Sequence, residues 1–218
     1  MSKLGMAAAL LTLALASPAS ASDPLAPLPA PAAPAPVDPR FPGATGELAG
    51  RLLAAHNRER ALVGHPPLAW DPDLAASAAS YAPTLASLGR LVHSPRETRP
   101  GQRENLAKAW HGTLTPEQLV DLWSREKRML QPGSSGPNCP QQFGCLRFPA
   151  VSRTGQWEDV AHYTQMVWPT TTRVGCAVFA ADWDYLICRY SPPGNIDGKP
   201  VFASAPVQLA QASARTGH

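Results

Sequence analysis

The stretch YLICRYSPPGNI at residues 185–196 decides the fold of this chain, together with HYTQMVW at residues 162–168. Aromatic and branched residues predict a strand over residues 185–191, which the Pro-Pro-Gly after it ends. A second strand is predicted over residues 173–180, just before a tight connection to the first, and a third over residues 104–110. The two strands nearest the C-terminus are therefore expected to form an antiparallel hairpin.

The cysteines give a test of that hairpin. If Asp182 is the tip, Cys176 and Cys188 are equally far from it and face each other across the two strands. Opposed residues of antiparallel strands have Cα atoms about 4.5–5.5 Å apart, within the range that a disulfide needs. Cys139 and Cys145 would then close a small loop. Four cysteines allow three pairings, and the hairpin favours this one without proving it.

Helical segments precede and interrupt these strands. They are expected over residues 46–63, 72–88, 116–129 and 159–168. Thr45 can cap the first, and Asp71 and Thr115 stand as N-caps immediately before a proline at the starts of the next two. Pro83 is expected to kink or split the second helix.

The N-terminal residues 1–21 resemble an export signal. Lys3 gives a positive start, residues 6–15 are an unbroken run of apolar and small residues, and Ala19-Ser20-Ala21 is a small-x-small cleavage site. The run is shorter than the roughly 20 residues that a membrane span needs, and no second candidate follows. The chain is therefore predicted to be secreted or periplasmic, with no transmembrane segment, and its cysteines to be oxidised.

Composition divides the rest of the chain into three parts. Residues 22–43 are rich in Pro and Ala and are predicted to be a disordered linker, although binding to a cell wall or a partner is an alternative. Residues 44–203 form the predicted domain, and residues 204–218 a flexible tail. The net charge of +3 is spread over mixed charges, which excludes a nucleic-acid-binding stripe.

Few residues point to chemistry by themselves. Glu126 shares a helical stripe with Val120 and Trp123, so its carboxylate must either find partners, with a perturbed pKa, or reach solvent at the edge of the stripe. Glu104, His93 and His162 are uninformative singly, and His65, in a loop before prolines, is expected to be exposed.

The two opening stretches resemble the two signatures of the CAP family, which includes cysteine-rich secretory proteins and plant pathogenesis-related proteins of class 1. Four shorter matches stand in the family's order: residues 56–58, 68–74 and 104–107, and the Trp123-x-x-Glu126 pair. The resemblance covers about residues 44–202. It implies an α/β fold, a three-layer α-β-α sandwich with a small, mainly antiparallel central sheet.

The resemblance also implies a cleft with a tetrad of two histidines and two glutamates. The matching positions are His93, Glu104, Glu126 and His162. Such a set suits zinc or another divalent cation, with His93 and His162 as direct ligands. His56 and Asn57 match a pair with a structural role in the packed interior. Two departures are Ala161 before the first signature and Arg103 where the family commonly has Gly; the arginine could alter the cleft rim.

Two functions are compatible with this tetrad. The favoured one is a secreted, non-catalytic binding module whose cleft holds a divalent metal and a small apolar ligand, such as a lipid or sterol-like molecule, or a cell-surface component. The alternative is a metal-assisted hydrolase acting on peptide or cell-envelope substrates, with Glu104 or Glu126 as the base. Ser94 and Ser124 do not stand in a nucleophile motif, which argues against a serine hydrolase.

Overall fold

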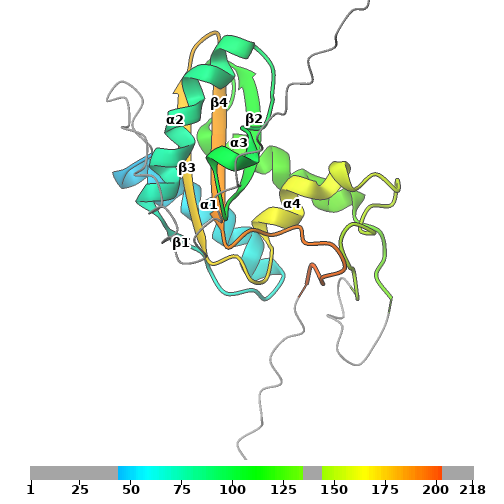
Figure 1. The fold of residues 1–218 in the computed structure, drawn as a ribbon. Coiled ribbons are helices and arrows are strands. Elements are labelled where there is room, and N and C mark those ends of the chain that lie inside the picture. The colour runs from blue at the N-terminus through cyan, green and yellow to red at the C-terminus, as the bar shows by residue number, and fades with distance from the viewer. Residues whose placement is uncertain (1–43, 135–143, 203–218) are drawn as a thin grey trace, which may run out of the picture. The chain divides into compact units, whose positions relative to one another are not determined.

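The computed structural model describes residues 44–134 and 144–202, which build a four-stranded sheet with helices on both faces (Figure 1). The strands are β1 (Ala69–Trp70), β2 (Arg103–Trp110), β3 (Arg173–Ala180) and β4 (Trp183–Ser191). They lie in the order β1-β3-β4-β2, with β1 and β3 parallel and the other neighbours antiparallel. The two-residue β1 was missed in the sequence because it is too short to show a strand pattern.

The central hairpin has the predicted register. Cys176 lies opposite Cys188, and a disulfide joins them. The strand β4 begins two residues earlier than predicted, so that Ala181 and Asp182 alone connect it to β3.

The helices follow the predicted order. They are α1 (Gly46–Leu62), α2 (Pro72–Leu88), α3 (Pro116–Ser124) and α4 (Ala161–Met166), with 3-10 turns at Arg96–Thr98, Arg125–Met129 and Trp157–Val160. Asp71 Oδ1 caps α2 by accepting from two backbone amides, and Thr115 caps α3. Thr45 precedes α1 but its side chain makes no capping hydrogen bond. Pro83 lies inside α2, which stays a single helix.

The sheet is buried on both faces, which makes the domain a three-layer α-β-α sandwich. Successive residues of a strand point to opposite faces. Leu106 and Ile187 accordingly pack with Ala78 and Leu85 of α2, while their neighbours in the strands join the larger core beneath the other helices. At Gly175 a Cβ would lie 2.3 Å from the backbone nitrogen of Ala75, so glycine permits the close approach of α2 to β3.

Several predicted parts lie outside the described residues. These are the export signal at residues 1–21, the linker at residues 22–43, the tail at residues 204–218, and Cys139 of the predicted Cys139–Cys145 bond. Within the described ranges, the longest apolar helix falls short of what a membrane crossing requires.

Candidate functional site

A cavity of about 570 Å³ opens where β2, α4 and three loops meet. Three members of the predicted tetrad line it, namely His93, Glu104 and His162, while Glu126 lies behind His162. The remaining wall combines basic, acidic, aromatic, aliphatic and amide side chains. It includes Arg96, Arg99, Arg103, Asn105, Phe148, Trp157, Gln165, Asn195, Ile196 and Asp197.

One wall carries a histidine held by a buried carboxylate. His93 Nδ1 lies 2.9 Å from Glu104 Oε1, and the His93 side chain is 53% exposed while the Glu104 side chain is fully buried. Glu104 comes from β2, and His93 from the loop that follows α2. The ring is therefore held at one nitrogen, and about half of the side chain remains exposed.

Both oxygens of Glu104 have further partners. Ser94 donates to Oε1 from its backbone amide and to Oε2 from its hydroxyl, and the buried guanidinium of Arg189 lies 3.3 Å from Oε2. Burial alone would raise the pKa of Glu104, but the hydrogen bonds from His93 and Ser94 and the charge of Arg189 hold it below its ordinary value. Glu104 is thus a carboxylate that stays ionised inside the domain.

The second pair is held by backbone groups instead of charges. His162 Nδ1 lies 2.6 Å from Glu126 Oε1, and Glu126 Oε2 accepts from the backbone amides of His162 and Tyr163, each at 3.0 Å. These amides belong to the first turn of α4, whose N–H groups have no partner inside the helix. The ring of Trp123 stacks on His162 with centroids 6.0 Å apart.

The position of Glu126 differs from the prediction in one respect. The third helix ends at Ser124, and Glu126 lies in the 3-10 turn that follows, so the α-helical stripe with Val120 and Trp123 does not extend to it. From this turn Glu126 reaches the first turn of α4, where it bonds His162 and Tyr163.

In the four groups the two histidines are the candidate metal ligands and the two glutamates orient them. Each histidine donates through Nδ1 to a glutamate, which leaves each Nε2 as the atom available for a ligand bond. Carboxylates commonly orient metal-binding histidines in this manner. No three of the four groups place ligand atoms within 4.8 Å of one another, so the described tetrad offers two nitrogens and no third close ligand.

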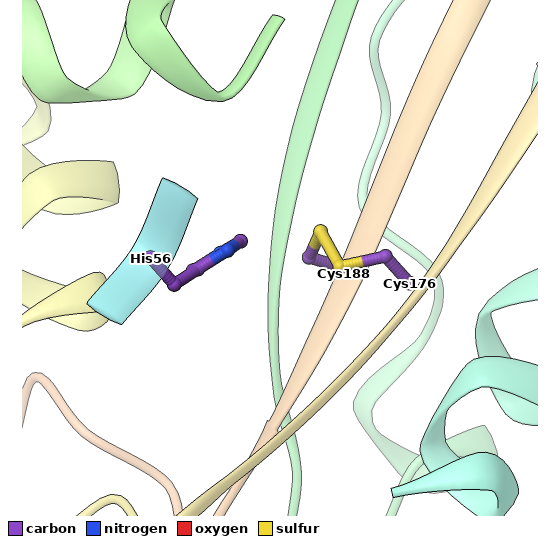
Figure 2. A group of neighbouring side chains, drawn as sticks. All are labelled: His56, Cys176 and Cys188. Carbon is purple, nitrogen blue, oxygen red and sulfur yellow. A yellow bond between two sulfur atoms is a disulfide. The ribbon is translucent and has the colours of Figure 1, made fainter. Parts of the chain in front are cut away.

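A closer cluster of ligand atoms lies elsewhere, at His56, Cys176 and Cys188 (Figure 2). The sulfurs are joined in a disulfide, His56 Nδ1 donates to the carbonyl of Leu52, and Nε2 pairs with the hydroxyl of Tyr190. Every candidate ligand atom is therefore already bonded, and thiolate ligation would require reduction of the disulfide. Burial lowers the pKa of His56 to about 4, so its ring is neutral in the folded protein at pH 7.

Asn57, the other residue assigned a structural role, ties α1 to the chain before β1. Its side-chain amide donates to the carbonyl of Leu68 and accepts from the amide of the same residue. The contacts of His56 and Asn57 are thus with the backbone and with core side chains, away from the cavity.

Most residues of the cavity wall were not predicted from the sequence. Trp157 lines the cavity with 40% of its surface exposed, and Phe148 packs edge-on against it at 5.4 Å between centroids. The basic side chains of Arg96 and Arg99 were not singled out either. The one available signal was Arg103, at a position where the sequence departs from the family pattern.

A family model identifies the family of this chain. The model of the cysteine-rich secretory protein family, CAP, matches residues 53–190. The chain belongs to the CAP family. Pathogenesis-related protein 1C of Nicotiana tabacum is 39% identical over 152 residues, which cover 69% of this chain and 78% of that protein. Pathogenesis-related protein 1 of Arabidopsis thaliana is 36% identical over 143 residues, 65% of this chain and 74% of that protein.

Solved structures resemble this CAP domain in fold. The crystal structure of NaASP2 with Zn²⁺ has a TM-score of 0.60 at 24% identity and covers 74% of this chain and 88% of that one. The structure of BmVAL-1 has a TM-score of 0.57 at 22% identity, with 73% and 84% covered. At these identities the likeness establishes the fold alone.

Proposed function

We propose that this CAP domain is a secreted, non-catalytic binding module whose cavity holds a divalent metal ion, zinc in the first instance, between His93 and His162. The observation that carries the proposal is the pair of imidazoles that line one cavity, each oriented through Nδ1 by its own glutamate. A small apolar molecule or a cell-surface component would occupy the rest of the cavity. Secretion rests on the N-terminal signal pattern and on the family description.

The hydrogen bonds of the two glutamates favour binding over catalysis. A general base needs an oxygen free to accept a proton from water or substrate. Glu104 is engaged by His93, Ser94 and Arg189. Glu126 is engaged by His162 and two backbone amides. With both carboxylates serving to orient histidines, the metal-assisted hydrolase is the weaker alternative.

Metal binding by the full chain tests the proposal. Zinc titration calorimetry should give one site in the wild type and no measurable binding in the His93→Ala/His162→Ala double variant. His111→Ala is the matched control, because His111 is exposed and pairs with Asp184 outside the cavity. NaASP2, which shares the fold, was crystallised with Zn²⁺, and this supports testing zinc first.

Three results would contradict the proposal. Zinc binding that persists in the double variant would place the metal elsewhere, and no binding by the wild type would leave the cavity without a metal. Turnover in a screen of peptides and peptidoglycan, lost in Glu126→Gln, would favour the hydrolase.

A further inference from the structure

Three arginines line the cavity beside the histidines. Arg96 begins the 3-10 turn after α2, Arg99 follows that turn, and Arg103 is the first residue of β2. They therefore come from one short connection, at the point where the sheet edge meets the cavity. None of them is part of the histidine–glutamate pairs.

Hydrogen bonds fix two of these guanidinium groups but do not use all of their N–H donors. Arg99 is 6% exposed and donates Nε to Ser94 and Nη1 to the carbonyl of Gln102. Arg103 is half-buried and donates Nε to the carbonyl of Gly194. An arginine has five N–H donors, so both retain N–H groups after these bonds. Arg96 has no hydrogen-bond or ion-pair partner for its guanidinium among the described residues.

Among the side chains that line the cavity, the three arginines outnumber the two acids, Glu104 and Asp197. Glu104 is already neutralised by the buried Arg189, 3.3 Å away. Glu104, although paired with Arg189, is also the acid that acts most on Arg99, followed by Glu97, and Asp197 acts on Arg103. Burial, and next the positive charges of Arg96 and Arg99, lower the pKa of Arg103. These mutually repelling cations would be stabilised by an anion between them.

Another part of the wall is apolar. Phe148 is buried, while Trp157 and Ile196 are each 40% exposed at the cavity. An indole and an aliphatic side chain left open beside charged donors suit the hydrocarbon part of a ligand whose polar end lies at the arginines.

We infer that the cavity binds a small organic anion, with a phosphate, sulfate or carboxylate group held by Arg96, Arg99 and Arg103 and an apolar body against Trp157 and Ile196. The inference rests on the proposed function because both use the same cavity. It changes the expected ligand from a small apolar molecule to one with an acidic group and an apolar body. It does not require the metal, because Arg99 and Arg103 are held by Ser94, Gln102 and Gly194.

Naphthyl phosphate is a suitable probe, with naphthol as its neutral analogue and inorganic phosphate as the anion without an apolar body. Titration of the full chain in chelator-containing buffer should show naphthyl phosphate binding more tightly than either. Because a hydrogen bond to a charged group is worth about 1.5–3 kcal/mol, Arg103→Gln should weaken binding about tenfold or more. Arg96→Gln, which removes no internal bond, should weaken it by a smaller factor.

Arg128→Gln is the matched control. It removes the same charge from a side chain with one carbonyl bond, to Arg125, that does not line the cavity. Its affinity for naphthyl phosphate should equal that of the wild type. Phosphatidylcholine vesicles containing phosphatidic acid identify the source of the anion: co-sedimentation that Arg103→Gln abolishes would indicate a lipid headgroup, and soluble binding alone a free organic anion.

Three results would overturn the inference. Naphthol could bind as tightly as naphthyl phosphate, or affinity could be unchanged in both Arg103→Gln and Arg96→Gln. Binding could also require added zinc, persist in both arginine variants and be lost in His93→Ala/His162→Ala. That combination would mean that the anion is bound by the zinc ion and not by the arginines. Zinc titration of Arg103→Gln separates the two proposals, since loss of anion binding with retained zinc binding leaves the metal site intact.

Discussion

The buried centre at His56 and the wall of the cavity both gather histidine near other potential ligand atoms, but they differ in what those atoms are free to do. At the centre, both nitrogens of His56 are hydrogen-bonded and both sulfurs are in a disulfide (Figure 2). In the cavity, His93 and His162 each use one nitrogen for a glutamate and keep the other. Proximity alone thus selects a cluster whose ligand atoms are all bonded, whereas the hydrogen bonds show that each cavity histidine uses only one ring nitrogen for its glutamate.

The cavity wall itself combines two ways of holding a histidine. Glu104 depends on a buried cation, whereas Glu126 depends on backbone amides of α4. A charged partner left alone in the interior is far more costly than an amide that water can reach. The two pairs should therefore differ in stability when each glutamate is removed.

The largest effect is expected from Glu104→Ala. It strands Arg189, whose side chain is 2% exposed, and should lower the free energy of unfolding by about 3–5 kcal/mol. Glu126→Ala leaves unsatisfied donors near the surface and should cost about 1–3 kcal/mol. Urea unfolding of both variants measures the difference, and equal losses would show that the buried charge does not distinguish the two pairs.

The next effect concerns the buried centre at His56 and is measured as the change of stability with pH. Unfolded histidine has a pKa near 6.5, and burial lowers that of folded His56 to about 4. Between these pH values the unfolded state binds a proton at His56 and the folded state does not. The free energy of unfolding therefore keeps its full value above pH 6.5 and falls as the pH drops toward 4. The expected loss from this ring is about 3 kcal/mol.

Unfolding free energies of wild type and His56→Gln across this range, in chelator-containing buffer, measure the contribution of His56. The variant should be less stable at neutral pH and should lose less stability on acidification. Burial also lowers the pKa of His65, which leaves some slope in the variant. A slope as steep as that of the wild type would mean that His56 titrates alike in the folded and unfolded chain.

Local signals in the sequence sufficed for much of the fold. A tip at Asp182 and two cysteines equidistant from it predict the register of β3 and β4, and Asp71 and Thr115 mark the helix starts because capping acts within one turn. The expectation that His65 is exposed was wrong. It is 6% exposed because its loop packs on the end of α4, where the ring bonds the carbonyl of Val167.

The cavity wall could not be predicted in the same way. The residues that close it come from loops without periodicity, and their neighbours are set by tertiary packing. Arg103 meets Gly194 across 91 positions of sequence, and Glu126 meets His162 across 36. The family resemblance supplied the four tetrad positions, but it had no counterpart for the arginines because Arg103 is a departure from its pattern.

The smallest effect concerns zinc binding in the cavity and tests whether His162 depends on Glu126. Glu126→Gln keeps the size of the side chain but replaces one acceptor oxygen by a donor, so it cannot bond both His162 Nδ1–H and the α4 amides as the carboxylate does. Loss of a carboxylate that orients a ligand histidine typically weakens metal binding by about 10–100-fold. Glu117→Gln is the control, since Glu117 pairs with Arg51 outside the cavity. Calorimetry should show weaker zinc binding in Glu126→Gln alone, and an unchanged affinity would mean that His162 does not need its glutamate to present Nε2.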